Sequence, residues 1–410
     1  MSEIRVKSTG TIKLFESDNT SHVTIASPSS LSANRTITIP DADVNLTNVN
    51  SIPTLRPNVS PLIINGDMAV SQRNTSVTGS TAGGYLTCDR VNIQISSIGT
   101  YTVIQESLTS GNAFNDGFNN AWRIDCTTAD ASPSASEYLR LTYRMETQDL
   151  SCFKKGTSNA QPYTLGFWVK SNKTGTAQVN LYDVINNRLV GDTYTINTAN
   201  TWEYKILNYP ADTSGALGDT NAEGIRIEFA LDAGSTYTGG TIPSAWETRA
   251  NGDRSVSDLS LADNTANDWA ITGLQLEVGE YTASTIPPFQ HESFGDNLSR
   301  CQRYYYQVTG TGKGRFANGN FFTQAIGDVI VPFPCKMRAA YSLSTSATSD
   351  IMITSVTAEA DCTAISLDTS LSLDAADVRF TVGSNIATVG HVSTMILKDS
   401  GSYLAFDTEL

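Results

Sequence analysis

Short runs of alternating apolar and polar residues dominate the chain between residues 62 and 279. Near the end of this region, Leu274, Leu276 and Val278 alternate with polar residues and glycine, a period of two typical of a half-buried β-strand. Strand candidates recur at fairly regular spacing with turn signals between them, and this predicts a β-sandwich or jelly roll. The candidates are Tyr85–Ile95, Tyr101–Glu106, Trp122–Cys126, Tyr138–Tyr143, Tyr163–Lys170, Ala177–Val184, Thr193–Ile196, Trp202–Leu207 and Gly224–Leu231.

A short helix is predicted after this region, behind a connector that contains prolines. Ser293 can cap the helix, with Asp296 three residues further on. Leu298, Cys301 and Tyr305 then recur at i, i+3 and i+7, which places them on one stripe of a helical surface.

The first 50 residues form a separate predicted unit of four short alternating segments. Each segment is too short and too poor in apolar residues to bury a core alone, so we expect these strands to pair with copies from other chains. A flexible tail is the alternative interpretation. The paired apolar positions are Ile4 and Val6, Ile12 and Leu14, Val23 and Ile25, and Ile37 and Ile39.

The last hundred residues again alternate like strands and predict a small C-terminal β-sandwich. The fold class is therefore mainly β, with a central jelly roll, a short helix and this second sandwich. The predicted layout is an N-terminal anchoring module (1–50), a proline-containing linker (51–61), a jelly roll (62–285), a connector with the helix (286–303) and the C-terminal sandwich (304–410).

Composition narrows the function classes. The chain has 410 residues, a formal net charge of −14 and only 17% charged residues. Nucleic-acid binding needs clustered Lys and Arg, so we expect none here. No apolar run is long enough to span a bilayer. The N-terminal MSEIRVKSTG lacks the apolar core of a signal peptide, and we expect a chain that is made and stays in a cytosol.

Catalytic motifs are missing from the sequence. The three histidines lie in three different predicted units, and no G-x-S-x-G, phosphate loop or H-E-x-x-H occurs. The six cysteines are spread singly, without the close pairs that zinc or a redox dithiol requires, and are interpreted as buried thiols. We therefore expect no enzyme. A pair of carboxylates for polysaccharide cleavage remains an alternative among 41 Asp and Glu.

Several segments resemble bacteriophage tail-fibre and related virion appendage proteins. The resemblance rests on TIKLFESDNTSHVTIASPSSLSANRTITIPDADVNL, on the end of the connector at CQRYYYQ, and on VPFPCKMRAAYSLS. The middle of the chain, with its early NGD turn, YTLGFWVKSN, TWEYKIL and GLQLEVG, resembles carbohydrate-binding-module-like, galactose-binding-like jelly rolls. The resemblance covers residues 1–50 and 271–410 well and the middle more loosely.

The resemblance implies a structural virion protein, a tail fibre that attaches to the host cell surface by binding surface polysaccharide. It implies assembly in the host cytoplasm, a homotrimer, and docking to tail, baseplate or adaptor proteins. In a fibre, the stripe of Leu298, Cys301 and Tyr305 would face the threefold axis. A capsid-bound or adaptor fibre without receptor binding is the runner-up, followed by a polysaccharide depolymerase tailspike.

Aromatic residues are the candidates for glycan contact, because sugars stack their C–H faces on flat rings. Trp168 and Trp202 lie within predicted strands, where core burial is the expected role. Tyr237 and Trp246 lie in a Gly-rich polar stretch between strands, and loops on a rigid scaffold concentrate binding residues. These two are the predicted glycan contacts, with Asn251 and Asp253 bonding sugar hydroxyls; anchoring of the loop is the alternative.

A structural calcium ion is the one cofactor considered. Jelly rolls of this kind often hold one near their first and last strands, and Asn65, Asp67 and Glu277 could supply oxygens. The simpler interpretation is that Asn65-Gly66-Asp67 forms only a turn.

Overall fold

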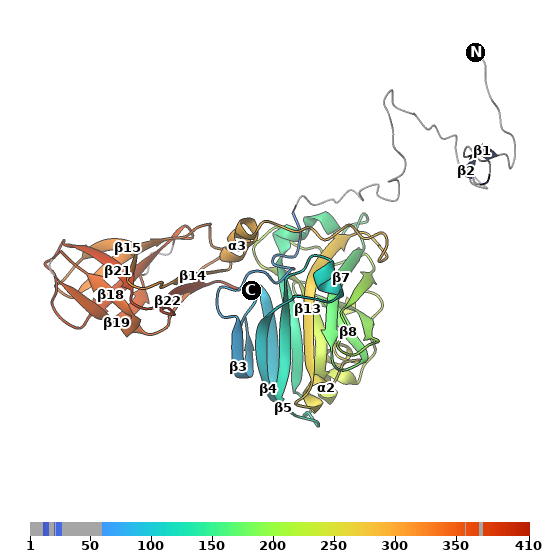
Figure 1. Cartoon of the computed structure of the whole chain (residues 1–410), viewed down its shortest axis with the longest axis horizontal. Helices are drawn as coiled ribbons and strands as arrows, with labels where there is room; N and C mark the ends of the chain where they lie inside the picture. The colour runs from blue at the N-terminus through green and yellow to red at the C-terminus, as the bar shows by residue number, and fades with distance from the viewer. Residues whose placement is uncertain (1–10, 16–19, 21, 27–59, 357, 369–371) are drawn as a thin grey trace, which may run out of the picture. The chain divides into compact units, whose positions relative to one another are not determined.

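The structure of the chain is a computed structural model that describes residues 11–15, 20, 22–26, 60–356, 358–368 and 372–410. The chain divides into two units, Met1–Pro53 and Thr54–Leu410. In the first unit, β1 (Thr11–Phe15) and β2 (His22–Ala26) form an antiparallel pair (Figure 1). Two of the four predicted N-terminal segments are therefore strands. The other two, around Ile4 and Ile37, lie outside the described residues.

The larger unit begins with an eleven-stranded antiparallel sheet in the order β10-β7-β13-β5-β4-β6-β11-β8-β9-β12, with β3 paired to β4. Its strands are β3 (Ser76–Gly84), β4 (Val91–Ser107), β5 (Asn120–Thr128), β6 (Tyr138–Glu146), β7 (Tyr163–Ser171), β8 (Gly175–Asp183), β9 (Arg188–Ile196), β10 (Glu203–Tyr209), β11 (Glu223–Ala233), β12 (Glu247–Thr248) and β13 (Asp268–Val278). The short helices α1 (Asn112–Asn115) and α2 (Ser235–Thr238) lie in the connections.

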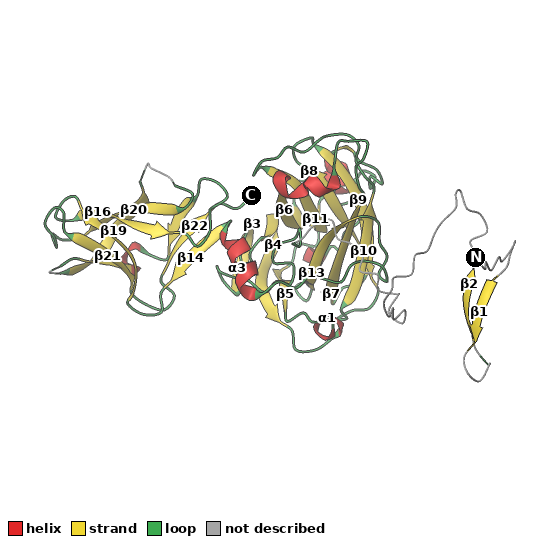
Figure 2. Ribbon diagram, turned by 90° about the horizontal axis from the view of Figure 1, so that it is seen from above, coloured by secondary structure: helices red, strands yellow, loops and turns green. Residues whose placement is uncertain are grey.

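Strand β4 folds this sheet into two layers. Its first part pairs with β6 and its second part with β5, and the change comes at Ser97 and Gly99, which have φ of 57° and 67°. Figure 2 shows β6, β11 and β8 on one side and β5, β13 and β7 on the other. The layers meet through aromatic rings: Phe167 of β7 lies 5.1 Å from Phe229 of β11, between ring centroids, although the two strands are far apart along the sheet.

The core of this sandwich matches the predicted alternation. Inward-facing residues of both layers are buried, and they include Leu165, Phe167 and Val169 of β7, each with no exposed surface. The mainly-β fold class and the central jelly-roll-like sandwich are confirmed. The sequence pattern did not predict β3, nor that Tyr85–Ile95 and Tyr101–Glu106 contribute to one long strand.

A helix and a second β unit follow the sandwich. Helix α3 (Phe294–Gln302) begins where predicted, because the Ser293 side chain accepts a hydrogen bond from the Asp296 amide. The strands are β14 (Tyr305–Thr309), β15 (Gly314–Phe321), β16 (Ile326–Pro332), β17 (Ser342–Thr345), β18 (Ile351–Thr354), β19 (Glu359–Leu367), β20 (Ala375–Val382), β21 (Val392–Leu397) and β22 (Tyr403–Asp407).

This C-terminal unit differs in topology from the predicted sandwich. Six strands close into a barrel in the order β15-β16-β20-β19-β18-β21, because β21 pairs with both β15 and β18, and β14-β22-β17 form a separate three-stranded sheet. Closure leaves the barrel without free edges. Among the described residues, no helix is long and apolar enough to cross a membrane.

Candidate functional site

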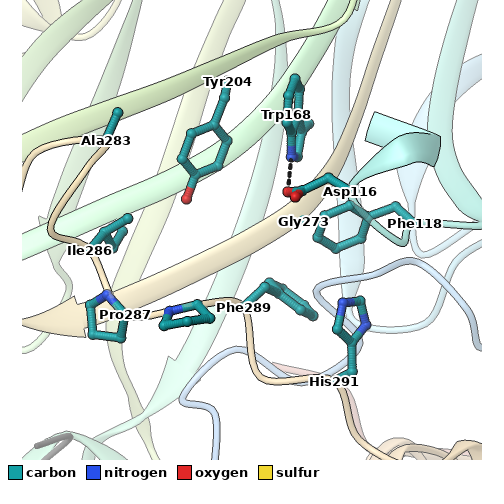
Figure 3. A pocket seen from close by; sticks show the side chains of 11 residues that line it. Asp116, Phe118, Trp168, Tyr204, Gly273, Ala283, Ile286, Pro287, Phe289 and His291 are labelled. Atoms are coloured by element: carbon teal, nitrogen blue, oxygen red, sulfur yellow. Dashed lines mark hydrogen bonds between the residues drawn. The ribbon is translucent and has the colours of Figure 1, made fainter. Parts of the chain in front are cut away.

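A pocket lined by aromatic rings opens on the outer face of the β10-β7-β13 layer (Figure 3). Trp168 of β7 lies between the buried Phe167 and Val169, so the alternation of the strand turns its ring away from the core. Tyr204 of β10 is paired with Trp168 in the ladder, and their ring centroids are 5.3 Å apart. Both rings are only partly buried and form one wall of the pocket.

The opposite wall is a cluster of three rings from the segment before β5 and the connector after β13. Phe118 contacts Phe289 edge-on, with ring centroids 4.9 Å apart, and lies 5.2 Å from His291. Phe289 and His291 are 4.8 Å apart. Phe118 is buried, whereas His291 is exposed at the rim. The connector residues Ile286 and Pro287 continue this wall.

Gly273 keeps the floor of the pocket open. The pairing of β13 with β7 shifts register between Thr272 and Gln275, and Gly273 has φ of +61° within this irregularity. A Cβ at this position would lie 2.8 Å from Cζ of Phe118 and 3.1 Å from Cδ1 of Trp168. Glycine therefore serves here both for its conformation and for the space it leaves between the two rings.

Two polar contacts fix the rings of the first wall. The indole Nε1 of Trp168 donates to Oδ2 of Asp116 at 3.2 Å (Figure 3). Nε2 of Gln275 donates to the hydroxyl of Tyr204 at 3.1 Å and to the carbonyl of Pro287 at 3.3 Å. The pocket thus has positioned ring faces and a small number of polar groups, the usual make-up of a small-molecule site.

The chemistry available in this pocket, which we call the aromatic pocket, is stacking and hydrogen bonding. Its volume is about 550 Å³. Its rings offer flat apolar faces, and Asp116 offers a carboxylate that can accept hydrogen bonds from hydroxyl groups. Asp116 is the only carboxylate among the lining residues, whereas glycoside cleavage generally needs two.

Trp246, a predicted glycan contact, is a core residue. Its side chain is 8% exposed, its Nε1 donates to the carbonyl of Pro210 at 2.8 Å, and its ring lies 5.9 Å from that of Tyr163. The prediction of a binding role for this ring was wrong, because the loop between β11 and β13 packs its tryptophan into the sandwich. Anchoring of the loop, the alternative, is what the contacts show.

The other three predicted glycan residues lie away from the aromatic pocket. Tyr237 is half-buried and packs edge-on against Tyr138, with ring centroids 5.2 Å apart. Asn251 is exposed, and its Oδ1 accepts from Nη2 of Arg249 at 2.9 Å. Tyr237 and Asn251 line a second pocket. Asp253 is engaged by the loop itself, since its Oδ1 accepts from the amide of Thr241 at 3.0 Å.

The sequence interpretation therefore ranked the tryptophans in the wrong order. Trp168 was expected in the core because it lies in a strand, and Trp246 at the surface because it lies in a loop. A usable signal was present in YTLGFWVKSN, where Trp168 alternates with Phe167 and Val169 and shares its face with Lys170. Trp202, in contrast, is buried at 5% exposure, as expected.

The predicted calcium ligands are engaged within the protein. Asn65 is 1% exposed; its amide nitrogen donates to the carbonyls of Val70 and Asp89, and its Oδ1 accepts from the amide of Val70. Asn65–Asp67 forms the turn that was the simpler interpretation, closed by a bond from the Met68 amide to the Asn65 carbonyl. Oδ1 of Asp67 accepts from Nδ2 of Asn297 at 3.1 Å. Glu277 lies on β13 and is 5% exposed.

The predicted threefold stripe packs inside one chain. Cys301 has no exposed surface and clusters with Ile64 and Tyr304, with Leu298 partly buried against them. Tyr305 is 5% exposed, and the guanidinium of Arg73 lies 3.6 Å from its ring centroid. Cys301 therefore has no surface with which to meet a second chain, and assigning it to an intermolecular seam was wrong.

Three carboxylates gather on the barrel, those of Asp328, Asp368 and Asp377. Arg379 neutralises part of this charge, with contacts of 3.1 Å to Asp328 and 2.6 Å to Asp368. Burial and the two neighbouring carboxylates raise the pKa of Asp377 above its ordinary value. An arginine within the cluster explains these acids without an ion. All six cysteines are free thiols.

Comparisons with known proteins give no family. No protein-family model and no curated protein matches the chain. Solved structures with low similarity include the enzymatically active domain of tailspike protein 4 of bacteriophage CBA120, at 13% identity and a TM-score of 0.27, over 53% of this chain and 21% of that one. This chain thus spans about a fifth of the tailspike chain.

Carbohydrate-binding modules are also among the similar structures. A CBM4 structure matches at 10% identity and a TM-score of 0.27, over 52% of this chain and 97% of that one. TmCBM61, solved in complex with β-1,4-galactotriose, matches at 9% identity and a TM-score of 0.25, over 53% and 99% of the respective chains. TM-scores this low carry no argument about function.

Proposed function

We propose that the chain binds a glycan in the aromatic pocket without cleaving it, and that it serves as an attachment fibre of a virion. The observation that carries the binding proposal is the pair of facing ring walls, Trp168 with Tyr204 and Phe118 with Phe289, held open by Gly273. A pyranose can stack its C–H face on one wall while a hydroxyl donates to Asp116.

The preformed geometry supports this function on energetic grounds. The Trp168 indole and the Tyr204 hydroxyl are already fixed by hydrogen bonds, so little side-chain entropy is lost on binding. Each stacked ring contributes on the order of 1 kcal/mol, by analogy with other aromatic contacts. Two stacked rings and a few hydrogen bonds of about 1 kcal/mol each give affinities in the millimolar range, which become strong attachment when several copies act together.

The attachment role is supported by the resemblance of residues 1–50 and 271–410 to tail-fibre proteins. We propose a homotrimer mounted on the tail through its first 50 residues, with host-surface polysaccharide as the ligand. A capsid-bound or adaptor fibre would use the same modules without a receptor. Polysaccharide cleavage is disfavoured at the aromatic pocket by its single carboxylate.

Titration of the full chain with neutral oligosaccharides tests the binding. Trp168→Ala and Tyr204→Ala should each weaken binding about five- to tenfold, with no reducing ends released from the glycan. Phe322→Ala is the matched control, because Phe322 is a 46% exposed ring on the barrel, outside the pocket. Equal losses in all three variants, or release of reducing ends, would refute the proposal.

Two further measurements test the attachment role. Gold-labelled antibody against the chain, viewed on intact particles, should mark the tail; label on the capsid would favour the runner-up. Light scattering should give three times the single-chain mass of 44.0 kDa. A single-chain mass at micromolar concentration would refute the trimer while leaving glycan binding intact.

A further inference from the structure

A second pocket on the sandwich is unusually rich in arginine. It lies over strands β6, β8 and β11 and the loop that follows β11, and its volume is about 400 Å³. Four guanidinium groups line it, those of Arg140, Arg226, Arg249 and Arg254. We call it the arginine pocket. Four cations in one pocket are notable in a chain with a net charge of −14.

Carboxylates neutralise only two of these arginines. The buried Glu228 accepts from Nη2 and Nε of Arg254, at 2.6 and 3.0 Å. Glu223 accepts from Nε of Arg226 at 2.7 Å. Among the described residues, neither Arg140 nor Arg249 has a carboxylate within salt-bridge distance. Within the described part of the chain, the pocket therefore carries positive charge that carboxylates do not balance.

Arg140 is the buried arginine with the most unpartnered donors in this pocket. Its side chain is 1% exposed, and its Nε and Nη2 have no hydrogen-bond partner among the described residues. The guanidinium carbon lies 4.1 Å from the ring centroid of Tyr138 and 4.5 Å from that of Tyr237. Two ring faces stabilise the cation, yet they leave N–H donors unused, and a buried unsatisfied cation is costly.

Protonation of the arginines is also affected. Burial and the nearby Arg254 cation lower the pKa of Arg140 to about 10, although Glu228 acts in the opposite direction. Burial and Arg254 also lower the pKa of Arg249. Both shifts have the sign expected where cations are buried close to one another.

We propose that the arginine pocket binds the carboxylate of an acidic sugar. Guanidinium groups pair with carboxylates through two parallel hydrogen bonds, and among the described residues Nε and Nη2 of Arg140 and Nε of Arg249 have no hydrogen-bond partner. Tyr182 and Tyr237 line the same pocket and position the cations, with Arg249 5.0 Å from the ring centroid of Tyr182 and Arg140 4.5 Å from that of Tyr237. The pocket is confined in size, so it fits a sugar unit rather than a nucleic-acid backbone, which needs an extended basic surface.

The two pockets are independent. The arginine pocket lies on the outer face of the β6-β11-β8 layer and the aromatic pocket on the outer face of the β10-β7-β13 layer. Inward residues of both layers fill the core between them. The chain would thus bind neutral and acidic units of a glycan on opposite faces, and either site can fail without the other.

Calorimetric titration of the full chain with tetragalacturonate tests the proposal. The same oligosaccharide as its methyl ester is the matched ligand control, since it keeps the rings and loses the charge. We expect the ester to bind at least tenfold more weakly, and salt to weaken binding of the acid. Equal binding of acid and ester would overturn the proposal.

Variants locate the site. Arg249→Gln and Arg140→Gln should each weaken tetragalacturonate binding at least tenfold, whereas the exposed Arg315→Gln, which lies outside both pockets, should leave it unchanged. Because Arg140 is buried, Arg249→Gln provides the decisive result if Arg140→Gln fails to fold. Unchanged binding in folded Arg249→Gln would overturn the proposal.

A third arm separates a sugar site from a plain anion site. Inorganic sulfate and monomeric galacturonate are each used to displace tetragalacturonate. Sulfate should need a far higher concentration than galacturonate to do so. Equal displacement by both would show that the pocket recognises charge alone, and would overturn the assignment to a sugar. If tetragalacturonate binds but neutral oligosaccharides do not, the proposal that the aromatic pocket binds a glycan is refuted. The proposal for the arginine pocket is then unaffected.

Discussion

Two tryptophans of the sandwich, Trp168 and Trp246, differ in exposure in the opposite way to what their secondary structure suggests. Trp168 lies in the middle of strand β7 and lines an open pocket, whereas Trp246 lies in the long connection between β11 and β13 and is 8% exposed. The strand residue is the accessible one because the alternation of β7 sends every second side chain to the outer face. The loop residue is buried because the connection folds back over its own sandwich.

The contrast shows that the type of element is a poor guide to exposure. A strand in a two-layer sandwich has one face toward the core and one toward solvent. An aromatic side chain on the solvent face can therefore contact a ligand. A long loop must bury apolar residues of its own to be held in place. Trp246 does this for residues 234–267, with help from Lys155, whose Nζ lies 5.1 Å from its ring centroid.

The largest effect should come from Trp246→Ala. Truncation leaves a cavity in the sandwich core and removes the bond to Pro210, so the free energy of unfolding should fall by roughly 3 kcal/mol. Urea denaturation measures this loss. Neutral glycan binding by the folded fraction should stay intact. A variant of unchanged stability with lost binding would reverse the roles assigned to the two tryptophans.

Trp168→Ala should have the opposite signature. Affinity for a neutral oligosaccharide should fall about five- to tenfold, because one stacking face is lost. The melting temperature should change little, since the ring is partly exposed. Calorimetry and thermal melting of the same preparation give both values. A melting temperature that falls as far as that of Trp246→Ala would show that Trp168 is structural.

Asp232 tests how the loop is held. Its Oδ2 accepts from the amide of Ala262. Burial, with Asp258 and Asp263, raises the pKa of Asp232 to about 7, although this hydrogen bond and Lys173 act in the opposite direction. The folded chain therefore holds a proton that the unfolded chain releases above its ordinary pKa near 4. This contribution to stability is fully present below about pH 4 and is lost as the pH rises through 7.

Asp232→Asn should remove that loss. Urea denaturation at pH 4.5 and at pH 7.5 measures the unfolding free energy of the variant and of the wild type. The variant minus wild-type difference should be more positive at pH 7.5 than at pH 4.5. The same difference between variant and wild type at both pH values would mean that Asp232 does not titrate in this range.

His291→Ala should have the smallest effect. His291 is exposed at the rim of the aromatic pocket, and rim contacts contribute little to affinity, so binding should weaken about twofold at most. Calorimetry alongside Trp168→Ala makes the comparison direct. A larger loss for His291→Ala than for Trp168→Ala would move the centre of the site from the strand to the connector.

Much of the secondary structure could be predicted because its signals are local. The alternation of Leu274, Leu276 and Val278 marks β13, and Ser293 with Asp296 marks the start of α3. Both depend on residues a few positions apart, whose side chains meet the backbone of their own element. The mainly-β class follows from many such signals.

Which residues of the outer faces stay exposed, and where they form pockets, depends on tertiary contacts. The bend of β4 at Ser97 and Gly99, the closure of the barrel through β21, and the covering of Trp246 all depend on contacts between residues far apart in the chain. The same holds for the two pockets, which join residues of several strands and of distant loops. The alternation along each strand sets which residues can face outward. The packing of distant segments sets which of them stay uncovered, because burial depends on neighbours that no local pattern contains.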